Sequence, residues 1–280
     1  MRVRGTRNHG AGGLAMGVAM ALGLGACGVS QQQEVQIGQQ ESAQIQQQLP
    51  LVQDAVINQY VSSLGNQIAS HTSRADLQWQ FYVVNTDVVN AFALPGGIVY
   101  VNRGVLEHAD KMDELAGVLG HEIEHVVRRH SVKQMEQMQG ANVGVALACT
   151  LTNICNNQAA AAAINVGGTA IFAKFSRTDE VQADEGGFKN VMNAGISPEG
   201  MLSFFQKLLA EEQSSSNSNV NSWFADHPGT EDRIADIQRM LAQVPPSQLR
   251  SLTTDTPAFQ QMKRRVMALP PAPKQAPNLR

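Results

Sequence analysis

The spacing of apolar residues predicts that most of the chain is helical. In residues 51–69 an apolar side chain recurs at every fourth position, at Val52, Val56, Tyr60, Leu64 and Ile68. This period matches one face of an amphipathic helix, which buries its apolar side against the rest of the protein. Further helices are expected over residues 104–109, 113–130, 178–194, 198–212, 228–243 and 258–269.

A small β-sheet is predicted after the first of these helices. Residues 78–85 alternate in polarity and are rich in aromatic and β-branched side chains, a pattern that is typical of strands. Residues 98–101 have the same composition, and Pro95-Gly96-Gly97 just before them marks a turn. The expected fold class is therefore α+β, predominantly α-helical with a small sheet.

The first 26 residues are typical of a secretory signal. Three arginines precede an apolar run over residues 11–26, which is too short to cross a bilayer comfortably. The run ends in Leu24-Gly25-Ala26-Cys27, which resembles the lipobox of bacterial lipoproteins. The resemblance implies cleavage before Cys27, lipid on Cys27 and residence in the periplasm, and Gly28 at the next position favours the outer membrane. The alternative is an ordinary signal with a chance cysteine.

The two remaining cysteines lie in an apolar segment of small residues. Cys149 and Cys155 form an even pair, which can make a local disulfide in an oxidising compartment. Two free, buried thiols are the alternative. Each arm of the segment, residues 141–173, is shorter than a membrane span and is interrupted by asparagines. We therefore expect a buried or partly exposed helical hairpin rather than a membrane hairpin.

The residues most informative about function are His121, Glu122 and His125, which form an H-E-x-x-H motif inside a predicted helix. Positions four apart on a helix share a face, so both imidazoles can bind one cation. Glu122 beside them can act on a metal-bound water, and Zn²⁺ readily takes two histidines and a carboxylate with one position left open. On a helix that continues through residue 130, His130 lies about 140° around the axis from His125. We therefore do not expect His130 to be a ligand.

A third ligand is expected from another element of the chain. Glu180 and Asp184 lie one helical turn apart in the helix predicted over residues 178–194. Glu180 can bind the metal, and Asp184 can accept a hydrogen bond from the free ring N–H of His121, which would fix the orientation of that ring. An acidic helix start without a metal has the same composition.

Two further motifs accompany the histidine motif. The segment from Asn90 to Gly97 reads N-A-F-A-L-P-G-G, and His227-Pro228 is followed by Arg233. Together with the H-E-x-x-H helix and the segment 176–184, they resemble in content and order the gluzincin metallopeptidases of the HtpX and CAAX-prenyl-protease type. The resemblance covers about residues 34–241 and points to the soluble periplasmic lipoprotein branch of that family.

This resemblance implies a zincin-type catalytic domain that holds one Zn²⁺ through His121, His125 and Glu180, with Glu122 as the general base. It also implies that His227 lies near the metal, where it stabilises the oxyanion of the tetrahedral intermediate or caps the zinc at rest. The alternative for His227 is an ordinary helix-entry residue beside a proline. Arg233 is expected to steady this region or the developing charge.

A substrate site is expected where the predicted turn meets the second strand. That strand can present an edge, to which an extended peptide adds as a further strand through main-chain hydrogen bonds. The residues expected to take part are Pro95, Gly96, Gly97, Ile98 and Val99. Because this mode reads the backbone, side-chain specificity is expected to be loose.

The expected organisation has four parts. They are a lipoprotein signal over residues 1–26, a glutamine-rich tether or first helix over 27–50, a zinc metallopeptidase domain over 51–243 and a proline-containing tail with a short helix over 244–280. We expect a metalloendopeptidase that acts in quality control of envelope proteins. The alternative is a membrane-anchored chaperone or binding lipoprotein with a latched or structural zinc site. Polypeptides are the expected partners, and a formal net charge of −3 gives no reason to expect nucleic acid.

Overall fold

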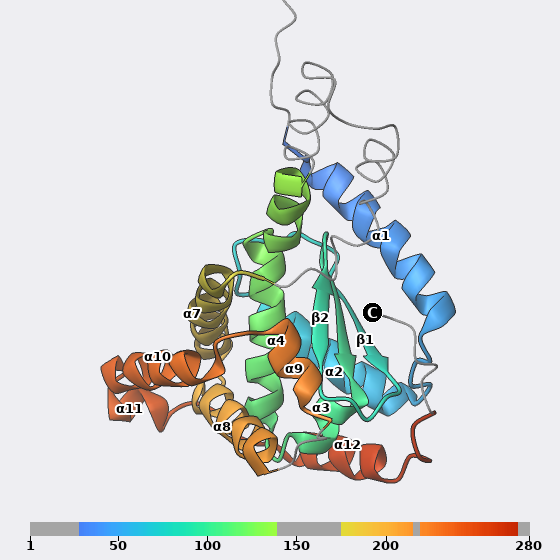
Figure 1. Cartoon of the computed structure of the whole chain (residues 1–280). Helices are drawn as coiled ribbons and strands as arrows, with labels where there is room; N and C mark the ends of the chain where they lie inside the picture. The colour runs from blue at the N-terminus through green and yellow to red at the C-terminus, as the bar shows by residue number, and fades with distance from the viewer. Residues whose placement is uncertain (1–27, 139–174, 215–218, 274–280) are drawn as a thin grey trace, which may run out of the picture.

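The computed structural model describes residues 28–138, 175–214 and 219–273. The predictions for the signal, for Cys27, for the pair Cys149 and Cys155 and for the hairpin in residues 141–173 therefore lie outside the described residues. Within the described ranges, helices surround a three-stranded sheet (Figure 1). This is the expected α+β, predominantly helical fold. No helix in these ranges is long and apolar enough to cross a bilayer.

The long helices and two of the strands lie close to where the residue pattern predicts them. In chain order the elements are α1 (Gln31–Gln48), α2 (Ala55–Ala69), β1 (Gln80–Val84), β2 (Ala91–Leu94), β3 (Ile98–Asn102), α3 (Arg103–His108), α4 (Met112–Val127), α7 (Arg177–Asn193), α8 (Glu199–Ser214), α9 (Asn221–Asp226), α10 (Thr230–Gln243), α11 (Pro246–Leu249) and α12 (Pro257–Met267). Residues 130–138 are helical as well. The residue pattern does not predict the short elements β2, α9 and α11.

The strands are ordered β1–β3–β2 across the sheet, with β3 parallel to β1 and antiparallel to β2. The prediction that the strand starting at Ile98 presents a free edge is therefore wrong, because β3 is central and pairs on both sides. The chain reverses between β2 and β3 at Gly96 and Gly97, whose φ angles are 82° and 100°. Glycine adopts such angles without steric cost, so the chain can reverse tightly here. β2 then pairs with β3 and lies on the outside of the three-stranded sheet.

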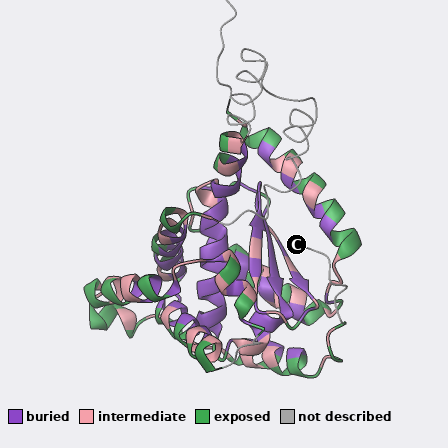
Figure 2. Cartoon of the chain, viewed as in Figure 1, coloured by how far each residue is buried: buried purple, intermediate pink, exposed green. Residues whose placement is uncertain are grey.

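Helix α4 runs through the centre of the molecule, between β2 on one side and α7 and α8 on the other (Figure 1). Every residue from Met112 to Val126 is buried (Figure 2). α7 comes very close to α4 where Gly187 faces Gly120, because a Cβ on Gly187 would lie only 2.8 Å from the carbonyl carbon of Gly120. This close approach brings the carboxylates of α7 within reach of the side chains on α4.

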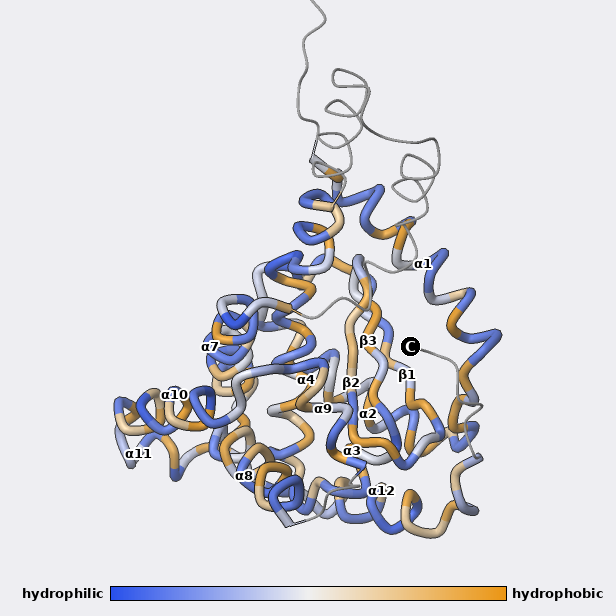
Figure 3. Tube along the Cα trace, in the orientation of Figure 1, coloured by the Kyte–Doolittle hydropathy of each residue, from blue (hydrophilic) through white to orange (hydrophobic). Residues whose placement is uncertain are grey.

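The packed body extends beyond the expected domain of residues 51–243 at both ends. At the C-terminal end, α12 adds three apolar side chains to the main hydrophobic core: Phe259, Met262 and Val266. At the N-terminal end, α1 is largely hydrophilic (Figure 3), yet its Glu34 is fully buried. Glu34 pairs with Arg74 at 2.7 Å and with Arg129 at 2.8 Å, so an ion-pair cluster helps to hold α1 in place.

Candidate metal centre

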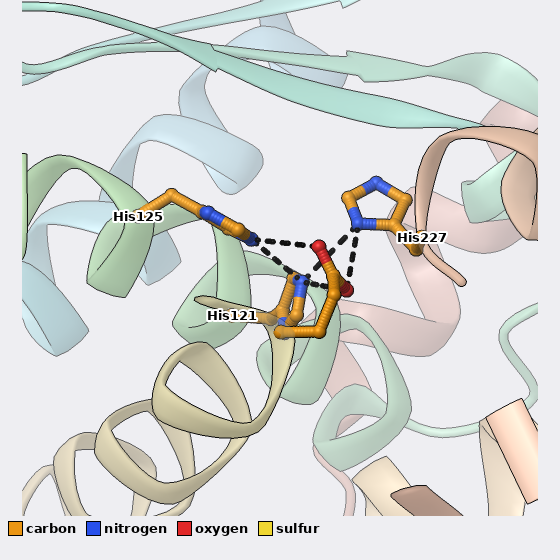
Figure 4. A group of neighbouring side chains, drawn as sticks. His121, His125 and His227 are labelled. Atoms are coloured by element: carbon orange, nitrogen blue, oxygen red, sulfur yellow. Dashed lines mark hydrogen bonds and ion pairs between the residues drawn. The ribbon is translucent and has the colours of Figure 1, made fainter. Parts of the chain in front are cut away.

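The last two turns of α4 hold the two histidines of the H-E-x-x-H motif. His121 and His125 are one helical turn apart, so their rings lie on the same side of the helix, and both are buried. Their Nε2 atoms are 3.0 Å apart. Both nitrogens therefore point into the same small volume (Figure 4).

Two further side chains reach this volume from other parts of the chain. Glu180, in the first turn of α7, places Oε2 3.4 Å from His121 Nε2 and Oε1 3.5 Å from His125 Nε2. His227, directly after α9, places Nδ1 3.3 Å from Glu180 Oε2. One potential ligand atom from each of the four residues lies within 4.8 Å of the others. The structure thus brings the three residues expected to be ligands together with His227, which the resemblance places near the metal.

The contacts among the four side chains leave a polar atom without a hydrogen bond, and a metal ion would bind that atom. Among the described residues, Glu180 Oε1 is buried without a hydrogen-bond partner, which is unfavourable for a carboxylate in a protein interior. A single cation between the rings would satisfy this oxygen and the Nε2 atoms of His121 and His125 at once. Imidazole nitrogens and carboxylate oxygens, four to a site, are the donors that Zn²⁺ takes. The donor set is therefore of the kind that holds zinc.

Glu122 lies beside this group and is completely buried. Neither of its carboxylate oxygens has a hydrogen-bond partner among the described residues, and Oε1 lies 3.6 Å from His227 Nε2. Burial raises the pKa of Glu122 above its ordinary value, although the nearby His227 and His121 charges act in the opposite direction. A carboxylate with a raised pKa and unpaired oxygens is suited to accept a proton.

Asp184 and Arg233 support the group from behind. Asp184 Oδ1 is 2.8 Å from His121 Nδ1, which is the contact expected from the sequence. The guanidinium of Arg233 lies 2.6 Å from Asp184 Oδ2 and 2.8 Å from Glu180 Oε2. Burial and the charge of Arg233 lower the pKa of His121. The contacts with Asp184 and Glu180 raise it by more than this, so that the net pKa is about 9. The carboxylates thus make this pocket attractive to a positive charge, whether a proton or a metal ion.

The structure brings His130 to His125, which corrects the geometric argument from the sequence. α4 ends at Val127, and Arg129 takes a left-handed backbone conformation with φ 58°. The chain therefore turns before residue 130, and His130 Nδ1 lies 3.0 Å from His125 Nδ1. His130 is still outside the group of potential ligands. No glycine or proline marks this break, so the residue pattern gives no sign of it.

The outer edge of β2, rather than β3, borders the candidate metal centre. Asn102 N donates to Asn90 O at 2.9 Å, and in an antiparallel pair the residues that face the partner strand alternate. Ala91 and Ala93 consequently direct their peptide groups away from β3. The carbonyl oxygen of Ala91 lies 3.4 Å from His227 Nε2, so His227 sits against this edge.

Residues 56–241 match the sequence profile of peptidase family M48. The chain belongs to peptidase family M48. The match covers more than half of the chain, including both helices of the candidate metal centre and His227. It confirms the resemblance to gluzincin metallopeptidases that the four motifs indicate, and it fits the zincin-type arrangement of α4, α7 and the sheet.

Named relatives within this family are similar over most of the chain. The beta-barrel assembly-enhancing protease of Escherichia coli strain K12 is 32% identical over 226 residues, which are 78% of this chain and 46% of the relative. The mitochondrial metalloendopeptidase OMA1 of Schizosaccharomyces pombe is 30% identical over 70% of this chain and 56% of its own length. The metalloprotease LoiP of Escherichia coli is 26% identical over 64% of this chain and 68% of its own length. The chain spans about half the length of the first two relatives.

Proposed function

We propose that this M48 chain is a zinc-dependent metalloendopeptidase that hydrolyses peptide bonds in proteins of the cell envelope. One observation carries the proposal: the buried atoms of His121, His125 and Glu180 converge on one point. Beside it lies the carboxylate of Glu122, which has no hydrogen-bond partner in the described part of the chain. Similarity to proteins named metalloprotease and metalloendopeptidase supports the same activity.

Each residue of the centre has a distinct task in this proposal. His121, His125 and Glu180 hold one Zn²⁺ per chain. The ion, when bound, makes a water nucleophilic at neutral pH and polarises the carbonyl of the scissile bond. Glu122 accepts the proton of that water and donates it to the leaving amine. The burial of Glu122 supports this role, because it keeps bulk water away from the carboxylate, whose oxygens accept no hydrogen bond from any described residue.

For His227 the geometry favours the resting cap over the oxyanion role. Its Nδ1 faces Glu180 Oε2 at 3.3 Å, and its ring stacks on Trp223 with centroids 4.5 Å apart. A histidine in this place occupies the position that a water or a substrate carbonyl needs. We propose that His227 moves aside when substrate binds. Arg233 acts at a distance from the reacting bond, by holding Asp184 and Glu180 in place.

The substrate is proposed to bind as an extended strand along β2. Ala91 and Ala93 have outward-facing peptide groups next to the metal centre. At Ala91 the N–H donates to Asn90 Oδ1 at 2.9 Å and the carbonyl lies 3.4 Å from His227 Nε2, so an incoming strand would replace these two contacts. This edge takes the place of the expected site at Pro95, Gly96, Gly97, Ile98 and Val99, which belong to the turn and to the central strand. Recognition through main-chain groups would accept many sequences. The name of the first relatives refers to beta-barrel assembly, and we therefore propose misassembled envelope proteins as the substrate class.

We also propose that the chain is processed before Cys27 and anchored by lipid on Cys27, in the periplasm and at the outer membrane. In this organisation the peptidase domain comprises residues 51–243 together with α1 and α12, which pack against it. Growth with a labelled fatty acid is expected to label the wild-type protein and to leave Cys27→Ala unlabelled and unprocessed. Equal labelling of both proteins would contradict the anchor.

Cleavage of casein by the purified chain tests the proposed activity. The wild-type protein is expected to cleave casein, to stop when phenanthroline removes the metal and to resume when a stoichiometric amount of Zn²⁺ is returned. Magnesium added in place of zinc is the matched control and is expected to restore nothing, because it prefers oxygen ligands. Cleavage that persists in the chelated protein would contradict a metal-dependent mechanism.

A further inference from the structure

We propose that His130 and Gln182 form a relay that fixes the ring of His125 in the tautomer that binds the metal. The inference rests on the proposed function, in which His125 is a metal ligand through Nε2. It adds two positioning residues that neither contact the ion nor belong to the H-E-x-x-H motif. The relay passes from α4, through the turn that follows it, to α7.

The break after α4 is what brings His130 to His125. On a continuous helix, residues five apart point about 140° away from each other. Here α4 ends at Val127 and Arg129 adopts φ 58°, a left-handed conformation that is unfavourable for a non-glycine residue. Glu34 holds Arg129 in this position through an ion pair of 2.8 Å to Nε. The turn is therefore fixed from α1, and it aims the His130 ring at His125.

The hydrogen bonds of the relay define where each proton lies. A neutral imidazole has one N–H, so a histidine that binds a metal through Nε2 carries its proton on Nδ1. The Nδ1 atoms of His125 and His130 are 3.0 Å apart, and a bond between two nitrogens needs one proton. His125 therefore donates and His130 accepts. The proton of His130 then lies on Nε2, which is 3.2 Å from Gln182 Oε1 and 3.5 Å from Asp179 Oδ1.

In the relay His130 accepts a hydrogen bond from His125, as Asp184 does from His121. Asp184 accepts from His121 at 2.8 Å, whereas His125 donates to the neutral ring of His130. Both supports end on α7, at Asp184 and Gln182, one turn or less from Glu180. A single helix thus supplies one ligand and orients the other two. The group next to His125 is an imidazole, and the Asp179 carboxylate lies on the far side of that ring, 3.5 Å from His130 Nε2. The ring therefore orients His125 without placing another carboxylate directly beside Glu180, Glu122 and Asp184.

Burial makes this relay difficult to replace with solvent. His130 is only 2% exposed, so water does not supply a substitute acceptor when its Nδ1 is removed. Phe175 stacks on the His125 ring with centroids 4.0 Å apart and planes 25° from parallel, which covers a face of the ring. Without its acceptor, His125 would be free to place its proton on Nε2, where it blocks the metal. Partners of this kind typically change metal affinity 10- to 100-fold.

The test is the zinc affinity of the full-length chain, measured by competition with a chromophoric chelator. His130→Leu keeps a similar volume but removes the acceptor, and we expect about 10- to 100-fold weaker zinc binding. In His130→Asn the amide oxygen takes the place of Nδ1, and we expect affinity within about threefold of wild type. Gln182→Leu is expected to weaken binding less than His130→Leu, because Asp179 Oδ1 also lies 3.5 Å from His130 Nε2. Gln182→Glu is expected to preserve binding, which repeats the comparison at a less buried position.

The outcomes separate this inference from the function on which it rests. If wild type binds zinc and His130→Leu and His130→Asn lose affinity equally, His130 only packs and the relay is overturned. The same conclusion follows if His130→Leu and Gln182→Leu bind as tightly as wild type. If wild type itself binds no zinc, the proposed metal centre is wrong, whatever the variants do. Circular dichroism of the zinc-free proteins shows whether each variant folds, and the Gln182 pair carries the test if His130→Leu does not.

Discussion

Replacing Glu122 by glutamine is expected to abolish peptide cleavage while zinc stays bound. Glutamine has the same shape but cannot accept a proton, and loss of a general base lowers rates by about 10²- to 10⁴-fold. The ligands His121, His125 and Glu180 are untouched, so zinc per chain should equal that of wild type. The measurement is kcat/KM for casein cleavage beside metal content for both proteins.

A matched control lies two residues further along the same helix. Glu124→Gln also removes a buried negative charge from α4, but Glu124 pairs with Arg128 at 2.8 Å and accepts from Asn190 at 2.8 Å, away from the metal centre. This variant is expected to retain cleavage. If Glu122→Gln cleaved as fast as wild type, Glu122 would not be the base. If wild type and variant both held zinc and neither cleaved, the latched-site alternative would gain support.

The second large effect is expected on stability, from Arg233→Met. Arg233 is 1% exposed and is shared by Asp184 and Glu180 at 2.6 and 2.8 Å. Removing one partner of a buried ion pair leaves uncompensated charge and typically costs about 3–5 kcal/mol. We expect a loss of this size in the free energy of unfolding of the metal-free chain, measured in urea. Zinc should recover part of it by neutralising Glu180.

The pH dependence of the same experiment has a defined sign. After the opposing effect of burial, Arg233 is the leading cause that lowers the pKa of Asp184 in the folded chain. A carboxyl with a lowered pKa contributes stability that is present above its unfolded value and disappears as the pH falls through the folded value. The loss from Arg233→Met should therefore be full at pH 7 and shrink at acidic pH.

An exposed arginine on α7 provides the control for this effect. Arg177 pairs with Asp232 at 3.8 Å, and both side chains are 80% exposed, a situation in which ion pairs contribute little. Arg177→Met should leave the urea midpoint almost unchanged. Arg233→Lys should be intermediate, since one ammonium group does not match the forked contacts of a guanidinium. Unchanged stability of Arg233→Met would show that Asp184 and Glu180 do not depend on it.

The parts of this protein that could be predicted from the sequence depend on local spacing. The apolar period of four in residues 51–69 is a property of one segment, and α2 occupies most of that segment. The H-E-x-x-H motif is equally local, because the turn of one helix alone brings His121 and His125 together. Glu180 followed from chemistry, since a two-histidine site needs a third donor.

The parts that could not be predicted depend on contacts between distant segments. β2 pairs with β3 because the turn at Gly96 and Gly97 folds it back, and only the three-dimensional sheet shows that β3 is central. The break before His130 is supported by Glu34, 95 residues away in the sequence. The same glutamic acid anchors α1, whose glutamine-rich composition alone is equally compatible with a free tether.

The central claim is most directly tested by X-ray diffraction from crystals of the zinc-loaded chain, recorded above and below the zinc absorption edge. The account predicts one anomalous peak within about 2.1 Å of His121 Nε2, His125 Nε2 and a carboxylate oxygen of Glu180, with His227 Nδ1 as the fourth ligand in the resting protein. If the peak lay near the other three ligands but too far from His227 Nδ1 for coordination, only the proposed cap by His227 would be wrong. An anomalous peak elsewhere, or none in crystals of protein that cleaves casein, would contradict the metal centre itself.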